Sequence, residues 1–384
     1  MTDRSSRCDA PSQRSRVATI AAALACAALL ASLAGGPGAA DNATPLAMPD
    51  GFSASVFASG LGSPRALAVD PTGTLLVSMP SRGQIVALPD RGGRAADPVV
   101  VADGLHLPHG LAFRGGDLYV AETGRIVRFA YDATTRRARN PTVVVPDLPA
   151  GQHHWTRSIA FGPDRGLYVS IGSSCDVCRE ADRRRAAIVR YDADGSAERL
   201  FATGLRNPVG LAFHPRTRAL WTTINERDWR RGGAPPDYVT EVRAGAAYGW
   251  PDCYVERGAF LPDPELADRR GCSGLTLPTL ELPAHSAPLG LAFYSGTAFP
   301  TPYRDSLYVA LHGARRELPV AGYAVVRVIV RGGRAVGVED FATGWRAGDR
   351  IWGRPVDLVT GRDGALYVSD DHGGHIVRIA FGAR

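Results

Sequence analysis

Helical periodicity is scarce in this 384-residue chain. Beyond the N-terminus, no long stretch repeats its apolar residues at helical spacing, which argues against a helical fold. The chain also lacks a basic run interleaved with aromatic residues, so its formal net charge of +6 does not indicate a nucleic-acid partner. Linkers and low-complexity tracts are absent after the N-terminal segment, so residues 41–384 are expected to form one domain.

What the chain does contain is a short apolar phrase repeated about six times. Its copies are residues 65–69 (RALAV), 110–113 (GLAF), 158–161 (SIAF), 210–213 (GLAF), 290–293 (GLAF) and 356–359 (VDLV). Most copies are followed by a polar turn and a second apolar run, and several by a third run. Strands recurring in this way predict an all-β fold, a six-bladed β-propeller with four-stranded antiparallel blades.

The segment before the first copy is expected to close the ring. Residues 52–57 (FSASVF) alternate like a strand, and propellers usually close when one chain terminus adds a strand to the blade formed by the other. Ligands of propellers bind over the central channel, so the residues that begin each blade are the first candidates for chemistry.

Residues 1–40 have the features of a signal peptide. Four arginines precede an alanine-rich apolar stretch, 17–34, and small residues follow it. An uncleaved membrane anchor is the alternative, because the apolar stretch approaches the length needed to span a bilayer. The sequence predicts a periplasmic or secreted protein with no membrane contact other than this segment.

Cysteines are few, and those after residue 40 are Cys175, Cys178, Cys253 and Cys272. An even number in an exported protein favours disulfides, and proximity predicts the pairs Cys175–Cys178 and Cys253–Cys272. The alternative for the first pair is a redox or metal motif. Arg179 stands where c-type haem attachment requires histidine, and no second such motif is present for zinc.

Several stretches resemble the soluble sugar dehydrogenases that depend on pyrroloquinoline quinone (PQQ), in the branch of the sorbosone, pyranose and aldose sugar dehydrogenases. These stretches are residues 152–164 (QHHWTRSIAFGPD), 205–213 (LRNPVGLAF), 247–253 (AYGWPDC) and 352–357 (WGRPVD). They follow one another in the family's order across the six-blade repeat.

The resemblance implies that His154 is a general base. Sugar oxidation needs a group that removes the hydroxyl proton, and a histidine with a near-neutral pKa suits that task. His153 is the less favoured neighbour, and Arg157, beside a strand, is ordinarily solvated. The resemblance also sets Arg206 and Asn207 against the quinone, where a guanidinium can stabilise developing negative charge.

Further cofactor contacts are implied at Arg354 and at the loop containing His312 and Arg315. Val356 stands where the glucose-oxidising branch has a second arginine, so the pairing of the cofactor carboxylates must differ here. His109 and His285 also precede inner strands and are expected on the same channel face as His154. Three histidines there could instead form a metal site, as in a propeller oxygenase.

A calcium site is implied at 225–228, with Glu226, Arg227 and Asp228 as candidates for its ligands and Asp237 behind them, because oxygen ligands suit a hard cation. The sequence thus favours PQQ- and calcium-dependent oxidation of a sugar, with an external acceptor such as a soluble quinone or cytochrome. A calcium-dependent hydrolase of the gluconolactonase type and a non-catalytic propeller that binds glycans or proteins are the alternatives, and fold alone does not separate them.

Overall fold

The computed structural model describes residues 44–151, 153–228, 234–268, 271–314 and 320–382. The predicted signal peptide and its cleavage zone lie outside them. None of the helices in this described part has the length and apolar character needed to cross a bilayer.

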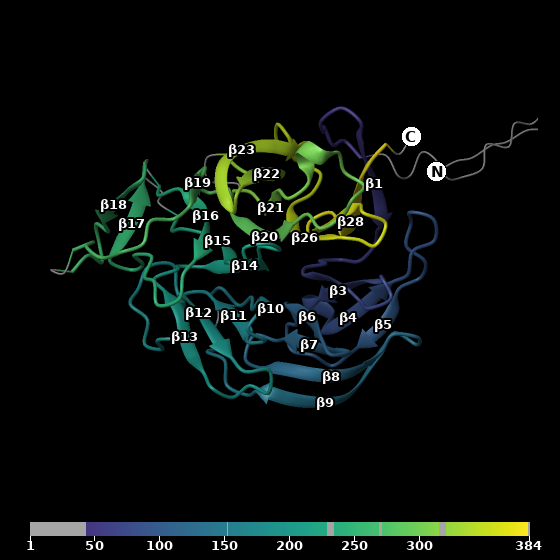
Figure 1. Ribbon diagram of the computed structural model, residues 1–384, viewed down its shortest axis with the longest axis horizontal. Coiled ribbons are helices and arrows are strands. Elements are labelled where there is room, and N and C mark those ends of the chain that lie inside the picture. The colour runs from purple at the N-terminus through teal and green to yellow at the C-terminus, as the bar shows by residue number, and fades with distance from the viewer. Residues whose placement is uncertain (1–43, 152, 229–233, 269–270, 315–319, 383–384) are drawn as a thin grey trace, which may run out of the picture. The chain divides into compact units, whose positions relative to one another are not determined.

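Six four-stranded antiparallel sheets stand around a central axis (Figure 1), which confirms the predicted propeller. From the inner strand outward, the first blade consists of β2 (Leu67–Val69), β3 (Leu75–Met79), β4 (Gln84–Leu88) and β5 (Val99–Ala102). The second consists of β6 (Leu111–Arg114), β7 (Asp117–Ala121), β8 (Ile126–Asp132) and β9 (Arg137–Val145). The third consists of β10 (Ile159–Phe161), β11 (Leu167–Ile171), β12 (Ala187–Tyr191) and β13 (Arg199–Thr203). The last three are β14 (Pro208–Phe213), β15 (Leu220–Ile224), β16 (Asp237–Val242) and β19 (Leu280–Leu282); β20 (Pro288–Phe293), β21 (Leu307–Leu311), β22 (Ala324–Arg331) and β23 (Arg334–Ala342); and β26 (Pro355–Thr360), β27 (Leu366–Asp370), β28 (His375–Phe381) and β1 (Phe52–Ala58).

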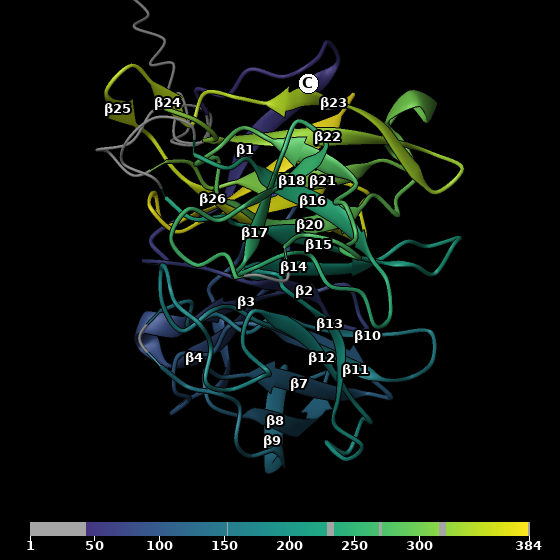
Figure 2. The same ribbon diagram turned by 90° about the vertical axis from the view of Figure 1, so that its left-hand side faces the viewer.

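Short elements complete the described chain. They are the hairpins β17 (Cys253–Glu256) with β18 (Ala259–Pro262) and β24 (Arg346–Ala347) with β25 (Arg350–Ile351), and the 3₁₀ turns η1 (Pro80–Arg82) and η2 (Thr301–Tyr303). The first hairpin extends from the fourth blade, at the left of Figure 1 and toward the viewer in Figure 2.

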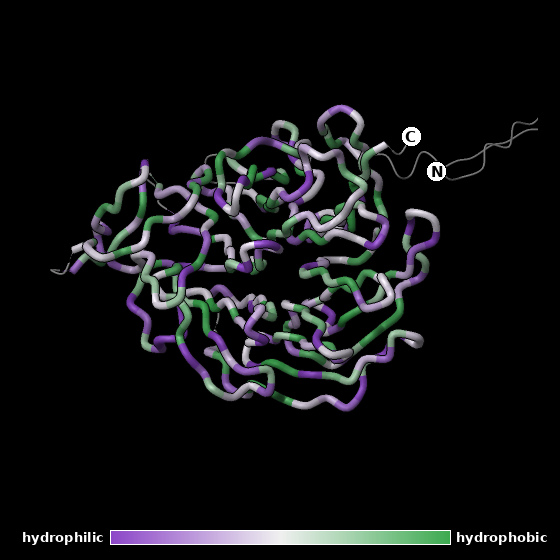
Figure 3. Tube along the Cα trace, viewed as in Figure 1, coloured by the Kyte–Doolittle hydropathy of each residue, from purple (hydrophilic) through white to green (hydrophobic). Residues whose placement is uncertain are grey.

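Each copy of the repeated phrase forms an inner strand, and the apolar run after it forms the second strand. The second strands β3, β11, β15, β21 and β27 are buried along their whole length. The outer strand β9, in contrast, is mostly exposed. Neighbouring blades cover both faces of a second strand, which explains its continuous apolar sequence. Figure 3 shows the same division, with hydrophobic segments inside the blades and hydrophilic ones at the rim.

The ring closes where the sequence predicted. β1 pairs with β28, with Phe52 opposite Phe381. The Phe52 ring also lies edge-on to Phe299, Tyr303 and Phe341, with centroids 4.8–5.0 Å away. These contacts fasten the last blade to its neighbour through aromatic packing.

Both predicted disulfides are present. Cys175 is bonded to Cys178 and Cys253 to Cys272, with Cα atoms 6.1 Å and 5.9 Å apart. The second bond joins the hairpin β17–β18 to the chain that returns to the fourth blade.

We predict that Cys253→Ser/Cys272→Ser destabilises this hairpin by about 3 kcal/mol, because the bond closes a loop with a sequence separation of 19. Limited proteolysis should then cut between residues 253 and 272 much faster than in the wild type, while the blades resist as before. Equal cleavage rates would contradict an effect of the bond on local stability.

Candidate active site

A cavity of about 370 Å³ lies among the loops that precede the inner strands. The predicted site residues that line it are His154, Arg206, Asn207, Glu226, Asp228, His285, His312 and Arg354. These residues come from four different blades. They meet here because each stands at the start of a blade or just after the end of a second strand. A polar cavity of this kind is where a propeller binds a small molecule.

His154 is held in one tautomer. Its Nδ1 lies 2.9 Å from the Ser173 carbonyl oxygen and 2.8 Å from Ser173 Oγ, and that hydroxyl donates to the Cys175 carbonyl. All three contacts are satisfied when Nδ1 carries the hydrogen, which leaves Nε2 as an acceptor. This is the form that a general base requires.

The pKa of His154 is lowered to about 3, first by burial and then by the charge of Arg206. The near-neutral pKa expected from the sequence is thus wrong, because that expectation ignored desolvation. The imidazole stays neutral across the physiological range. Its unprotonated form is fully populated, with Nε2 open as an acceptor.

Arg157 is completely buried rather than solvated. It donates to the carbonyl oxygens of His154 and Thr156, each at 2.7 Å, and to that of Pro149 at 2.5 Å. His154 itself has a positive φ of 45°. Arg157 therefore fixes the turn that presents the imidazole.

Arg206 is 4% exposed and is held on two sides. One nitrogen donates to the carbonyls of Asn225 and Glu226 at 3.1 Å and 2.8 Å. Another pairs with the Asp176 carboxylate at 2.5 Å, and the guanidinium lies 5.4 Å from the centroid of the Trp250 ring. The charge is thus fixed in place at the cavity wall.

Asn207 carries a buried side-chain oxygen, Oδ1, with no hydrogen-bond partner in the described structure. Such an atom is costly unless something binds it. Gly172 packs against this side chain and His154: a Cβ on Gly172 would lie 2.3 Å from Asn207 Oδ1 and 2.6 Å from the His154 Cβ. Only glycine lets the two side chains lie this close to the end of β11.

A second network lines the opposite wall. His312 Nε2 lies 2.9 Å from Asp371 Oδ1, and Arg65 donates to Asp371 Oδ2 at 2.6 Å. Burial lowers the pKa of His312 to about 4, so that ring is also neutral. Arg354 donates to the carbonyls of His312 and Gly313, which fixes the loop against the cavity.

Val356 cannot replace the missing second arginine of the glucose-oxidising branch, because it is buried with Val209 and Leu289 in an apolar cluster. Arg65 lines the cavity instead. With Arg206 and Arg354 it supplies positive charge from three blades.

Two carboxyl groups at the cavity are buried with little compensating charge. Burial raises the pKa of Glu226 to about 7 and that of Asp237 to about 6. Asp237 accepts hydrogen bonds from the backbone of Glu226 and Ala287, each at 2.8 Å. Asp228 pairs with His285 Nδ1 at 2.9 Å. A cation beside these groups would supply the charge that they lack.

Two predicted residues lie elsewhere. The Arg227 side chain is buried against Asp263 and Glu265, at 2.7 Å and 2.5 Å, which leaves its backbone carbonyl as the candidate metal ligand. Glu226 and Asp228 line the cavity, whereas the Arg227 side chain does not. His109 lies in the central channel, with its ring 5.7 Å from that of Trp155. Arg315 is outside the described residues.

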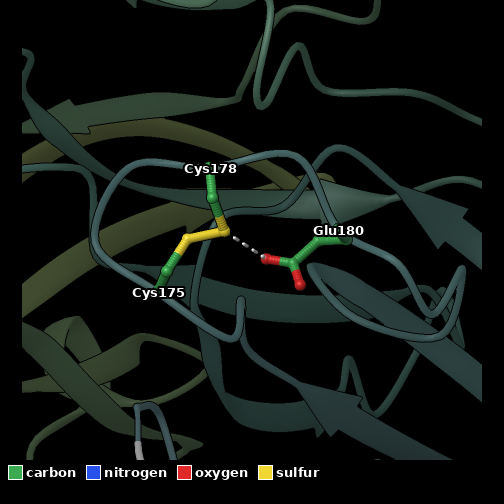
Figure 4. Close-up of side chains that lie close together, drawn as sticks. All are labelled: Cys175, Cys178 and Glu180. Atoms are coloured by element: carbon green, nitrogen blue, oxygen red, sulfur yellow. Dashed lines mark hydrogen bonds between the residues drawn. A yellow bond between two sulfur atoms is a disulfide. The ribbon is translucent and has the colours of Figure 1, made fainter.

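The metal alternatives lose support. In the described ranges, the one group of three His, Cys, Asp or Glu ligand atoms within 4.8 Å is Cys175, Cys178 and Glu180 (Figure 4). Its two sulfur atoms are bonded to each other, so no thiolate is present to bind a metal or to act as a free redox pair. His109, His154 and His285 do not converge.

Sequence reasoning missed Ser173, Asp176, Asp371 and Gly172. Their roles depend on contacts between loops far apart in the chain, and although Asp176 lies between the paired cysteines 175 and 178, that motif does not reveal its contact with Arg206. Arg65 carried a usable signal, since it stands two residues before the first inner strand, as His109 does before the second.

Comparison with known proteins identifies the family of this chain. A family model described as TrAA12-like matches residues 46–381. The PQQ-dependent pyranose dehydrogenase of Coprinopsis cinerea is 28% identical over 88% of this chain, which covers 55% of that protein's length. An aldose sugar dehydrogenase of Escherichia coli is 25% identical over 62% of each chain.

Solved structures show the same fold. The PQQ domain of the Coprinopsis pyranose dehydrogenase in its holo form matches with a TM-score of 0.77 and 25% identity, over 90% of this chain and 99% of that one. A calcium structure of the AA12 enzyme of Trichoderma reesei matches with a TM-score of 0.76 and 22% identity, over 88% and 97%. The chain therefore belongs to the TrAA12-like family, whose relatives are soluble PQQ-dependent pyranose and aldose sugar dehydrogenases.

Proposed function

We propose that this protein is a PQQ-dependent dehydrogenase that oxidises an aldose or a related sugar at its hemiacetal or aldehyde carbon. The observation that carries the proposal is one cavity in which a neutral His154 with a free acceptor nitrogen faces the fixed charge of Arg206 and the unpartnered oxygen of Asn207. The relatives named above are PQQ-dependent sugar dehydrogenases.

The cavity suits the cofactor. PQQ has three carboxylates and an ortho-quinone, and Arg65, Arg206 and Arg354 provide three guanidinium groups on the cavity wall. Arg206, Asn207, His285, His312 and Arg354 would hold it. When bound, PQQ supplies a quinone that accepts a hydride.

The chain's own residues do the rest. His154 Nε2 takes the proton of the sugar hydroxyl while Ser173 holds the Nδ1 hydrogen, so the imidazole becomes charged only as the substrate loses its proton. Arg206, and Asn207 through its Nδ2 amide, would donate to a cofactor oxygen on which negative charge develops. Because Arg206 is already fixed by Asp176 and two carbonyls, little reorganisation is needed as charge develops.

We also propose that calcium accompanies the cofactor, close to Glu226, Asp228 and Asp237. The support is the raised pKa of two buried carboxyls and the calcium structure of the fungal relative. Calcium takes six to eight oxygen ligands, so backbone carbonyls, water or the cofactor would complete the shell.

The alternatives have less support. A gluconolactonase-type hydrolase needs acidic ligands converging from several blades, and the described carboxylates of the cavity form no such set. A non-catalytic propeller has no need for a desolvated base or a fixed guanidinium at its axis. We propose that the protein is exported, which fits its two disulfides. We also propose that it passes its electrons to an external acceptor such as a soluble quinone or a cytochrome.

We predict that purified protein reduces an artificial electron-accepting dye only with PQQ and an aldose present, and faster with added Ca²⁺. A sugar panel with PQQ alone, Ca²⁺ alone and both together measures this. Sugar-independent dye reduction, or none across the panel despite measured PQQ binding, would overturn the proposed activity.

We predict that His154→Ala lowers kcat by about 10²–10⁴-fold while PQQ still binds, as expected for loss of a general base. Exposed His106 offers a matched control, and His106→Ala should keep the wild-type rate. His153→Ala should slow turnover far less than His154→Ala. If the substitutions at 153 and 154 have equally small effects, the base has been misassigned.

We predict that Gly172→Ala lowers kcat by about tenfold to hundredfold, because the added methyl group must displace Asn207 or His154 from their positions. Gly337→Ala is the control, since a Cβ there would make only an ordinary contact at 3.9 Å. Melting temperatures should show that both variants fold. Unchanged kcat in folded Gly172→Ala would show that this close packing does not position the two side chains.

A further inference from the structure

One short segment, residues 173–176, holds both His154 and Arg206. Ser173 is fully buried, and its carbonyl and hydroxyl oxygens both contact His154 Nδ1. The Ser173 amide donates to the Arg206 carbonyl at 2.8 Å. The backbone of one residue thus joins the base of the third blade to the cation of the fourth.

Asp176 makes the second connection. Its carboxylate accepts from Arg206 Nη2 at 2.5 Å, and its carbonyl accepts from Arg206 Nε at 3.3 Å. The carboxylate is half-exposed at the cavity edge, whereas the guanidinium is almost completely buried. The direction in which Arg206 points therefore depends on where the chain holds residue 176.

The Cys175–Cys178 disulfide fixes that position. The bond closes a ring around Asp176 and Val177, and the Cys175 carbonyl accepts the Ser173 hydroxyl at 2.8 Å. Glu180 accepts the Ser174 amide at 2.9 Å, and Arg179 pairs with Asp252 at 2.6 Å (Figure 4 shows the cysteines and Glu180). A segment outside the regular strands is in this way held by one covalent bond and by side-chain contacts of Ser173, Glu180 and Arg179.

We propose that the Cys175–Cys178 loop is a positioning element for catalysis. In it, Asp176 orients Arg206, and the disulfide keeps Ser173 and Asp176 in fixed positions relative to His154. The inference rests on the proposed function. Reduction by a dithiol, with transfer of two electrons and two protons, gives two thiols and an oxidised dithiol, and it removes the covalent closure of the ring.

The carboxylate is tested by a series that leaves the disulfide intact. Asp176→Ala should lower kcat by about tenfold, because a hydrogen bond to a charged group is lost, with a smaller change in KM. Asp176→Asn keeps an oxygen for Arg206 and should restore most of kcat. Asp117→Ala removes an exposed pair with Arg128 on the second blade, outside this loop, so it serves as the control with wild-type kcat. Equal kcat in the wild type and in folded Asp176→Ala would overturn the role of Asp176.

The disulfide is tested by hydrogen exchange, which requires neither cofactor nor activity. In protein treated with dithiol, with the reduced thiols counted, the Ser173 amide should exchange about tenfold faster or more. Cys175→Ser/Cys178→Ser should show the fast rate with and without dithiol. In Cys253→Ser/Cys272→Ser, the Ser173 amide should exchange at the wild-type rate before reduction and faster after it.

Unchanged Ser173 exchange in protein whose Cys175 and Cys178 are shown to be reduced would overturn the proposal. If the wild type shows no sugar-dependent dye reduction, the proposed function fails while the exchange result still stands. If Cys175→Ser/Cys178→Ser does not fold, dithiol-treated wild type and Asp176→Ala decide the question.

Discussion

The close approach of neighbouring inner strands at the propeller axis is the constraint on which the rest of the structure depends. A Cβ on Gly110 would lie 2.5 Å from the Arg157 carbonyl oxygen, and one on Gly210 would lie 2.6 Å from that of Leu289. Real side chains do not tolerate such distances, so the axis requires glycine at these positions. The same packing fixes the separation between the loops that surround the cavity.

Hydroxyl groups strengthen this arrangement. Ser170 donates to the Val209 carbonyl at 3.0 Å, Thr223 to that of Leu289 at 2.5 Å, and Ser369 to that of Arg65 at 2.6 Å. In each case the second strand of one blade binds the start of the next. Because Arg206 stands three residues before Val209, the position of its side chain follows from that of the strands.

The sequence predicted most of the frame because the frame is repetitive. The phrase beginning at Gly110, Gly210 and Gly290 reflects a steric requirement that recurs at three of the six blades. The alternation in residues 52–57 reveals the closing strand. The disulfides followed from proximity. His154, Arg206, Asn207 and Arg354 could be located because the stretches around them resemble those of the PQQ-dependent sugar dehydrogenases. The convergence of blade starts on the axis agreed with that resemblance.

The remainder depended on distances that no local pattern records. The pKa of His154 depends on burial beneath other loops and on Arg206, and Asp371 meets His312 and Arg65 only after the ring closes. Arg227 stood beside two acidic residues that line the cavity, yet its side chain points to Asp263. Adjacency in sequence is a weak guide wherever side chains alternate in direction.

The joint between β1 and β28 has a consequence for biosynthesis. The last blade combines residues 52–58 with residues 355–381, so a nascent chain carries an unpaired β1 edge while the five other blades are made. Open strand edges and exposed apolar faces invite pairing with other chains. Ring closure thus waits for the final strands of the polypeptide, and until then the growing protein depends on protection from its neighbours.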